Sequence, residues 1–328
     1  MDASKPPYHL YRDFEQPVIK ILKEVNGLRS AQKEGAEDLS REIREKEDQL
    51  EGLKLEIAAR LTPHQRVLQA RHPLRPTATE LVGHMCTDVM ELHGDRGVRD
   101  DPAILTALGR LGAHRVMIVG HRKGAQGDVQ GKIDCNFGMA NPEGYRKAML
   151  KMRLAERFGI PIVTLVDTPG AFPGLEAEER GQAWAIAENL QDMTGLRVPI
   201  VVAVIGEGGS GGALGIGIGD RVLMMENAYY SVITPEGCAA ILWKTRDKAA
   251  EAAQQLRLTA PDLHRLGIVD DVIQEPTLGA HWGPARAATS LKQAIQRALN
   301  ELVDVPTDVL LEARYNKFRR MGEHLFAV

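Results

Sequence analysis

The sequence predicts an α/β fold, in which helices cover both faces of a largely parallel sheet, preceded by an N-terminal helical arm. Three observations indicate this fold. Continuous apolar stretches of strand length, 160–166 and 198–205, are typical of buried parallel strands. Longer stretches of helical pattern alternate with them. The first 62 residues carry only a narrow apolar stripe among many charges, so they form a region of their own.

The arm, residues 1–62, contains two helical patterns. Apolar residues recur at helical spacing from Phe14 to Val25, and Gly27 then interrupts the pattern. Apolar residues from Ala36 to Ile57 follow an a/d heptad pattern with Lys46 at one seam position. Two interpretations stay open: a two-helix arm folded on its own domain, or an arm that packs on another subunit.

The second domain is expected at 63–328, entered through a basic, proline-rich connector at 62–76. Asn141-Pro142-Glu143 has the residues of a helix start. In chain order we expect a hairpin of strands 103–108 and 115–120, a helix 141–159, a strand 160–166, a helix 176–193, a strand 198–205, short strands 221–225 and 229–233, and helices 248–256 and 284–302.

Composition excludes several classes of protein. Lys and Arg number 41 against 44 Asp and Glu, a net charge of −3 that does not favour binding to nucleic acid or to a membrane surface. No run of 18 apolar residues is present, and the first 25 residues do not resemble a signal peptide. We therefore expect a cytoplasmic protein.

Cysteine and histidine give no metal-binding or disulfide pattern. The three cysteines, Cys86, Cys135 and Cys238, lie far apart in the sequence, and the ten histidines show no metal-ligand spacing. His264 and His281 are interpreted as surface or core residues. We expect no metal on this chain.

A first candidate site follows the buried strand 160–166. The segment Asp167-Thr168-Pro169-Gly170-Ala171-Phe172-Pro173-Gly174 alternates proline and glycine, which predicts a rigid turn. It falls at the carboxyl end of a parallel strand, where α/β folds gather ligands. An elaborate strand-to-helix turn without a binding role is the alternative.

A second candidate site follows strand 198–205, in the segment Gly206-Glu207-Gly208-Gly209-Ser210-Gly211-Gly212-Ala213-Leu214-Gly215. Glycine lets a ligand approach the main chain closely, and successive free N–H groups bind anions. The same segment matches a dinucleotide fingerprint, but only a short glycine-broken stretch separates it from the next strand. The favoured interpretation is an oxyanion hole of main-chain N–H groups.

Gly208, Ser210 and Gly212 also fit the G-x-S-x-G pattern of a serine hydrolase. Asp262 or Asp270 with His281 would supply the remaining catalytic residues in the required order. Nothing else in the sequence fixes these partners, so the hydrolase remains the alternative function. A non-catalytic scaffold is a third possibility.

Two basic segments are weaker candidates for anion binding. Gly120-His121-Arg122-Lys123-Gly124 ends a predicted strand, and Gly144-Tyr145-Arg146-Lys147 begins a predicted helix. Solvated surface charge is an equal or better explanation for both.

These segments, taken with others, resemble one family. The glycine-rich segment and the segment 167–174 recur there, together with stretches at 136–139, 142–148, 177–182 and 231–239. In these motifs, which run in order from near Asp13 almost to the end, the chain closely resembles the carboxyltransferase α subunit of bacterial multi-subunit acetyl-CoA carboxylase.

The resemblance implies a crotonase-type (ClpP/crotonase) spiral fold of ββα units. It implies transfer of the carboxyl group from carboxybiotin on a carrier protein to acetyl-CoA, which forms malonyl-CoA in the first committed step of fatty acid synthesis. It also implies that the chain acts only with a β subunit, as α2β2, alongside biotin carboxyl carrier protein and biotin carboxylase. No cofactor is bound covalently to this chain, and zinc is expected only on the β subunit.

The resemblance also assigns the site residues. The N–H groups of Gly211 and Gly212 would stabilise the biotin oxygen, with a helix beginning near Gly212 adding its dipole. The surrounding substrate-binding residues would be Gly208, Gly209, Ser210, Ala213, Gly170, Ala171 and Phe172. Ser210 would shape the loop rather than act as a nucleophile.

One departure from the family pattern concerns coenzyme A. Basic residues usually precede the Asn136-Phe137-Gly138 motif, but here Asp134 and Cys135 take those positions. A role for this stretch in holding coenzyme A phosphates is therefore not expected.

Overall fold

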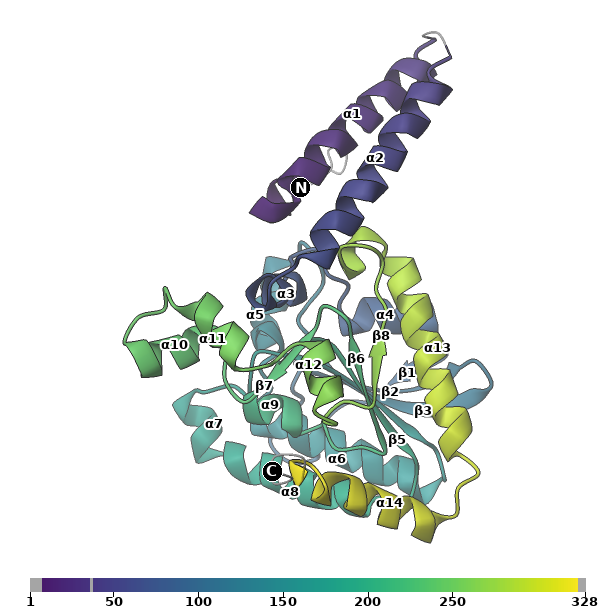
Figure 1. Ribbon diagram of the computed structural model, residues 1–328. Coiled ribbons are helices and arrows are strands. Elements are labelled where there is room, and N and C mark those ends of the chain that lie inside the picture. Colours follow the sequence, from purple (N-terminus) through teal and green to yellow (C-terminus); the bar gives the residue numbers. More distant parts are fainter. Residues whose placement is uncertain (1–7, 36–37, 324–328) are drawn as a thin grey trace.

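The computed structural model describes residues 8–35 and 38–323 (Figure 1). One sheet organises the body. Its strands, in their order across the sheet, are β1 (Thr87–Glu91), β2 (Ile104–Leu111), β3 (His114–His121), β4 (Ile162–Thr168), β5 (Ile200–Gly209), β6 (Arg221–Met225) and β8 (Asp271–Ile273), with β7 (Tyr229–Ser231) paired to the end of β5. The pairs β1–β2 and β2–β3 are antiparallel, and all later pairs are parallel. Helices cover both faces, as the sequence predicts. One face carries α4 (Ala78–Met85) and α13 (Pro284–Leu302), and the other carries α6 (Pro142–Arg157) and α8 (Gln182–Gly195).

The arm is a pair of helices that projects from the body (Figure 1). Helix α1 (Gln16–Lys33) runs through Gly27, so the prediction that the helical pattern stops there is wrong. Helix α2 (Ser40–Ala59) packs along α1. Ala36, expected at the start of the heptad pattern, lies outside the described residues.

The base of the arm is attached to the body by a small apolar cluster. Val18, Ile21, Val25 and Leu50 pack with Leu278, which comes from the body far along the sequence. The outer part of the arm is held mainly by ion pairs between its two helices, such as Lys46 with Glu24 at 2.6 Å.

The expected connector is a helix rather than an irregular segment. Helix α3 (Pro63–Ala70) begins at Thr62, whose side chain accepts a hydrogen bond from the N–H of Gln65. Val67 and Ala70 of this helix are buried against Tyr229 of the sheet. The proline that suggested a connector instead occupies the first helical position.

The first three strands form a meander. Strands β2 (Ile104–Leu111) and β3 (His114–His121) make the predicted hairpin, closed by Gly112 at a φ of 63°. Strand β1 (Thr87–Glu91), which the sequence analysis did not identify, is exposed along its whole length at the edge of the sheet. Helix α4 (Ala78–Met85) leads into it.

The middle of the chain follows the predicted alternation. Helix α6 (Pro142–Arg157) starts after Asn141, and strand β4 (Ile162–Thr168) is fully buried. The single helix expected at 176–193 is instead two helices, α7 (Leu175–Glu179) and α8 (Gln182–Gly195). They are separated at Gly181, whose φ of 83° does not continue a helix.

The glycine-rich segment is partly a strand. Strand β5 (Ile200–Gly209) extends four residues beyond the predicted end, because Glu207, Gly208 and Gly209 pair with β7 (Tyr229–Ser231). Helix α9 (Ser210–Leu214) follows without a loop. Strands β6 (Arg221–Met225) and β8 (Asp271–Ile273) complete the parallel part of the sheet.

The last third of the chain is largely helical and includes helix α13, which has the predicted bounds. None of the helices in the described ranges has the length and apolar character needed to cross a membrane. The remaining elements are α5 (Val129–Asp134), α10 (Pro235–Trp243), α11 (Ala249–Gln255), α12 (Ala260–Arg265), α13 (Pro284–Leu302), α14 (Thr307–Arg319) and four 3₁₀ turns, Tyr8–Leu10, Asp13–Glu15, Asn136–Gly138 and Ala280–Trp282.

Candidate active site

The two candidate segments meet in one pocket, which we call the glycine pocket. Its volume is about 430 Å³. Gly170, Ala171 and Phe172 line one side, and Ser210, Gly211 and Gly212 line the other. Glu178 and Gln182, which the sequence analysis did not single out as site residues, also lie on the wall, together with Ile186. The pocket forms because β4 and β5 are neighbouring parallel strands, so the segments that follow them leave the same edge of the sheet.

The walls of the glycine pocket touch backbone to backbone. A Cβ atom at Gly212 would overlap the main chain of Gly170 and Ala171, and one at Gly209 would overlap the main chain of Pro169. Side chains at these two positions would therefore force the walls apart. Gly211 differs, since a Cβ there would meet only Ile186, at an ordinary 3.7 Å.

The other predicted substrate-binding residues lie behind the pocket surface. Gly208 and Gly209 are buried in β5, and Gly208 pairs with Tyr230 in β7. Ala213 is fully buried in the core. These three residues therefore shape the wall of the glycine pocket without lining it.

Ser210 connects strand to helix directly. Its φ of 53° is in the left-handed region, which is unfavourable for a residue with a side chain. This conformation turns the chain sharply enough that α9 begins immediately after β5, and it leaves Ser210 exposed at the pocket mouth.

The side chains needed for a serine hydrolase do not gather at Ser210. The Asp262 carboxylate accepts a hydrogen bond from the Thr259 hydroxyl at 2.8 Å, and Asp270 is paired with Lys317. His281 binds Glu15 at the base of the arm. Across residues 8–35 and 38–323, the Ser210 hydroxyl makes no hydrogen bond to a base, so the hydrolase alternative lacks its catalytic residues.

Helix α9 begins on the wall of the glycine pocket. Ser210, Gly211 and Gly212 are the first three residues of α9, where N–H groups have no acceptor within the helix. A helix does begin here, as expected, with these local N–H groups at its start. It has only five residues, and the contribution of its dipole stays a prediction.

Two buried side chains hold α9 in place by hydrogen bonds to main-chain carbonyls. The Tyr145 hydroxyl of α6 donates a hydrogen bond to the Gly212 carbonyl at 3.3 Å. The Asn189 amide of α8 donates to the carbonyls of Tyr145 and Gly215, at 3.0 and 2.9 Å. A helix of five residues is not stable alone, so these bonds hold it in place. Asn189 gave no signal in the sequence beyond its place in a helical pattern.

The first basic segment is part of a buried ion-pair network. Lys123 Nζ lies 2.6 Å from Asp167 and 2.8 Å from Glu207, and Arg71 Nε donates to Glu207 at 2.7 Å. Although burial raises the pKa of Glu207, the charges of Lys123 and Arg71 hold it down to about 2. These cations are neutralised within the chain. The network fixes the ends of β4 and β5, on which the pocket depends.

His121, in the same segment, is fully buried and uncharged. Burial lowers its pKa to about 3, and the nearby charge of Lys123 contributes. The Asp167 N–H donates to its Nδ1 at 3.4 Å. A neutral histidine that cannot take up a proton near pH 7 does not provide the positive charge expected for an anion site.

The second basic segment is also engaged within the chain. Lys147 Nζ lies 2.6 Å from Asp100, and Arg146 Nε lies 3.3 Å from Asp95. Both side chains therefore attach α6 to the loop that follows β1.

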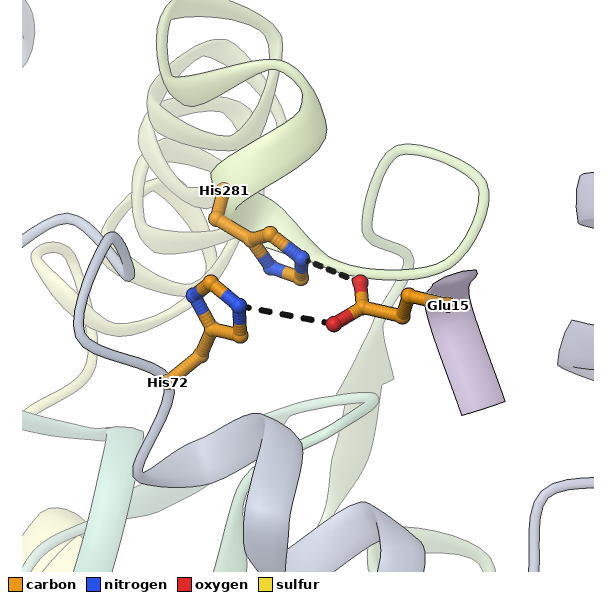
Figure 2. Close-up of side chains that lie close together, drawn as sticks. All are labelled: Glu15, His72 and His281. Atoms are coloured by element: carbon orange, nitrogen blue, oxygen red, sulfur yellow. Dashed lines mark hydrogen bonds and ion pairs between the residues drawn. The ribbon is translucent and has the colours of Figure 1, made fainter. Parts of the chain in front are cut away.

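A buried cluster that the sequence spacing did not reveal joins the arm to the body (Figure 2). Glu15 Oε1 lies 2.8 Å from His281 Nε2, and Glu15 Oε2 lies 3.4 Å from His72 Nε2. The two imidazole rings stack with centroids 3.8 Å apart. The Glu15 carboxylate also accepts hydrogen bonds from the N–H of Arg12 and from Trp282 Nε1, each at 2.9 Å.

Two histidines and one carboxylate resemble a metal-ligand set, but the proton positions do not suit a metal. A metal-binding imidazole normally donates its other N–H to an acceptor. His72 Nδ1 instead accepts the Leu74 N–H at 3.1 Å, which leaves the proton on Nε2, facing Glu15. The cluster therefore fastens the arm to the body through a carboxylate surrounded by donors.

Similar folds occur among solved carboxyltransferases. Transcarboxylase 12S with bound methylmalonyl-coenzyme A aligns with a TM-score of 0.55 and 22% identity, over 68% of this chain and 40% of that one. The β subunit of P. aeruginosa geranyl-CoA carboxylase aligns with a TM-score of 0.54 and 16% identity, over 77% and 45% of the two chains. The chain thus spans less than half the length of each. These similarities define the class of fold, the crotonase-type fold of acyl-CoA carboxyltransferases, as expected.

Sequence comparison identifies the family within this class. Residues 11–322 match the family described as "Acetyl co-enzyme A carboxylase carboxyltransferase-like". The acetyl-coenzyme A carboxylase carboxyl transferase subunit alpha of Chromobacterium violaceum is 49% identical over 312 residues, 95% of this chain and 97% of that protein. The same subunit of Thermus thermophilus is 49% identical over 310 residues, 94% of this chain and 98% of that protein. The chain belongs to this α-subunit family, and it is a component of a biotin-dependent carboxyltransferase.

Proposed function

We propose that the glycine pocket is the place where this chain takes part in carboxyl transfer from carboxybiotin to acetyl-CoA, forming malonyl-CoA. The observation that carries the proposal is the convergence of Gly170–Phe172 and Ser210–Gly212 on one pocket with free main-chain N–H groups on its wall. The hydrolase alternative is not proposed, because Ser210 lacks a base.

The glycine pocket fits the ureido group of biotin chemically. Its walls are main chain and small side chains, so a flat polar ring can reach the N–H groups without a side chain in the way. Carboxybiotin, carried on a partner protein, supplies the carboxyl group, and its departure leaves negative charge on the ureido oxygen. Preorganised N–H donors suit that charge.

Each residue of the glycine pocket has a defined task in this proposal. The N–H groups of Gly211 and Gly212 donate to the oxygen that becomes negative, a contribution of about 3–4 kcal/mol per donor when preorganised. Gly170–Phe172 forms the opposite wall and limits the access of water. Ser210 sets the turn through its positive φ. The donors for the acetyl enolate come from the β subunit.

The β subunit would dock on exposed apolar side chains that lie on the same side of the molecule as the glycine pocket. Helices α7 and α10 lie on the same side of the molecule as α9 (Figure 1). Leu175 of α7 and Ile241 and Leu242 of α10 are 71%, 62% and 64% exposed. Such exposed apolar side chains are typical of an interaction surface. A partner seated there would close the pocket.

The arm would take part in subunit packing within an α2β2 assembly. It projects beyond the apolar cluster at its base, and Leu55, on the second arm helix, is 60% exposed. Biotin carboxyl carrier protein and biotin carboxylase would complete the enzyme, with no zinc site on this chain.

The docking surface is tested by co-purification with the β subunit. Replacing Ile241 and Leu242 together by serine should abolish recovery of the complex. The control, Val309→Ser, changes a residue that is also exposed, at 53%, but lies on α14. Normal recovery of the double variant would contradict the docking surface.

The function is tested by measuring malonyl-CoA formation from acetyl-CoA and carboxylated carrier protein. The reaction is run with this chain alone, with the β subunit alone and with both. Activity only in the mixture supports the proposal. An assembled but inactive mixture, or ester hydrolysis by this chain alone, would refute it.

A further inference from the structure

A second hollow, which we call the α6 pocket, lies between helix α6 and the segment that follows strand β1. Its volume is about 380 Å³. Five of the lining residues are basic, three are leucine, and none carries a carboxylate: Leu92, His93, Arg96, Leu150, Lys151, Arg153, Leu154 and Arg157. It shares no lining residue with the glycine pocket, so the proposed function does not account for it.

The buried ammonium of Lys151 lacks a carboxylate partner. Its Nζ donates to the main-chain carbonyls of His93 and Gly94, at 2.9 and 2.7 Å, and it forms no ion pair in the described part of the chain. Burial lowers its pKa and the charges of Lys147 and Arg96 lower it further, against the smaller opposing effect of Asp100 and Asp95. A buried cation among other cations is stabilised by an anion that enters the pocket.

The rim adds further uncompensated charge. Arg96 and Arg157 are exposed and, within residues 8–35 and 38–323, neither pairs with a carboxylate. The carboxylates of the neighbouring loop are already engaged, Asp95 with Arg146 and Asp100 with both Lys147 and the lining residue His93. Arg96 also has a φ of 59°, a conformation that non-glycine residues rarely adopt outside functional sites and turns.

The positive charge of Arg153 is already offset, since this residue pairs with Asp192 across α6 and α8. Arg157 lies in the last turn of α6, where a cation also balances the helix dipole. Lys151 and Arg96 have no such role, because one is buried in the helix interior and the other comes from a separate segment. The positive charges of Lys151 and Arg96 are therefore not offset within the chain and face the α6 pocket.

We propose that the α6 pocket binds a nucleotide-sized phosphate ester at a site separate from the glycine pocket. Guanidinium groups present paired N–H donors that match phosphate oxygens. Leu92, Leu150 and Leu154 supply an apolar wall for the carbon skeleton of the ligand. The volume is within the range of small-molecule sites, about 300–1,000 Å³.

The test is calorimetric titration of the full-length chain with ADP and with pyrophosphate, at low and at high salt. Wild type should bind one ADP, and pyrophosphate more weakly because it cannot contact the leucines. High salt should weaken the binding of both ligands.

The double variant Arg96→Ser, Arg157→Ser should bind ADP at least about tenfold more weakly, since each arginine makes a charge-assisted contact. Arg286→Ser, an exposed arginine on α13, is the control and should bind ADP like wild type.

A second variant keeps the test independent of the arginines. Leu154→Asn should remove the preference for ADP over pyrophosphate without adding charge, and thermal melts show whether each variant is folded. Absence of ADP binding by wild type, or undiminished binding by the folded double variant, would overturn the proposal. Competition between free biotin and ADP would show that the site is not separate from the glycine pocket. With the β subunit and no ADP, the double variant should form malonyl-CoA like wild type, so failure here is distinguishable from failure of the proposed function.

Discussion

Gly212→Ala should disable the glycine pocket while leaving the fold in place. The added Cβ would overlap the main chain at Ala171 N and Gly170 C, and it would lie 2.8 Å from the Gly170 carbonyl oxygen. Ordinary contacts of this kind begin at 3.4 Å, so the facing wall must move back by more than half an ångström. The wall is main chain, which cannot rotate aside as a side chain could.

The expected losses of stability and of activity both follow from this displacement. Overpacking of this kind costs about 1–3 kcal/mol of folding free energy. A displacement approaching 1 Å at a reacting centre can lower the rate about 100-fold. We therefore expect malonyl-CoA formation by the mixture with the β subunit to fall about 100-fold in kcat, with the thermal midpoint lowered by several degrees.

The control for this experiment is Gly83→Ala. Gly83 lies within α4, a Cβ there would meet nothing within 4 Å, and alanine is the better helix former by about 1 kcal/mol. This variant should keep full activity and equal or higher stability. Wild-type activity and stability in Gly212→Ala would refute the reasoning, because the two walls could not then be in fixed backbone contact.

Three further predictions concern other parts of the molecule. Ser210→Ala should retain most of its carboxyl-transfer activity, since the hydroxyl makes no bond to a base; loss of kcat in a folded variant would restore Ser210 as a nucleophile. Arg314→Met should lower the free energy of unfolding in urea by about 3–5 kcal/mol, because it leaves Asp220 buried without its partner at 2.7 Å; a loss below 1 kcal/mol would contradict a tightly held pair. Burial lowers the pKa of His281 to about 4, so the unfolded chain takes up a proton near pH 6.5 that the folded chain refuses. Stability should therefore be constant above pH 7 and fall between pH 6.5 and 5, with about 2 kcal/mol of the fall due to His281 and a similar part due to buried His121. The fall should be smaller by about 2 kcal/mol in His281→Gln; an identical pH profile for the two proteins would count against this assignment.

The local sequence predicted much of the secondary structure, because the decisive signals lie within a few residues of one another. Asn141-Pro142 starts α6 where expected, and the apolar run at 160–166 overlaps buried β4. The glycines at 206–212 indicated that main chain, rather than side chains, would form the site. Family membership was also accessible from these ordered motifs.

Errors arose where a residue's role depends on distant neighbours. The Thr62-Pro63 pair reads as a connector but begins a helix that packs against Tyr229. Glycines normally end a strand, yet β5 continues to Gly209 because β7 supplies hydrogen bonds from about 20 residues further on. The end of β5 is therefore set by the strand that pairs with it, which the local sequence does not reveal.

The sequence by itself determined the family, the order of elements and the glycine segment that lines the pocket. The tertiary structure alone decided which charges are free. Lys123 looked like an anion ligand but is held between Asp167 and Glu207, whereas Lys151 drew no notice and lacks a carboxylate partner among the described residues. Glu15 and His281, 266 positions apart, meet at the base of the arm. Coulomb interactions act over a few ångströms in space, and separation along the chain does not reveal which groups come that close.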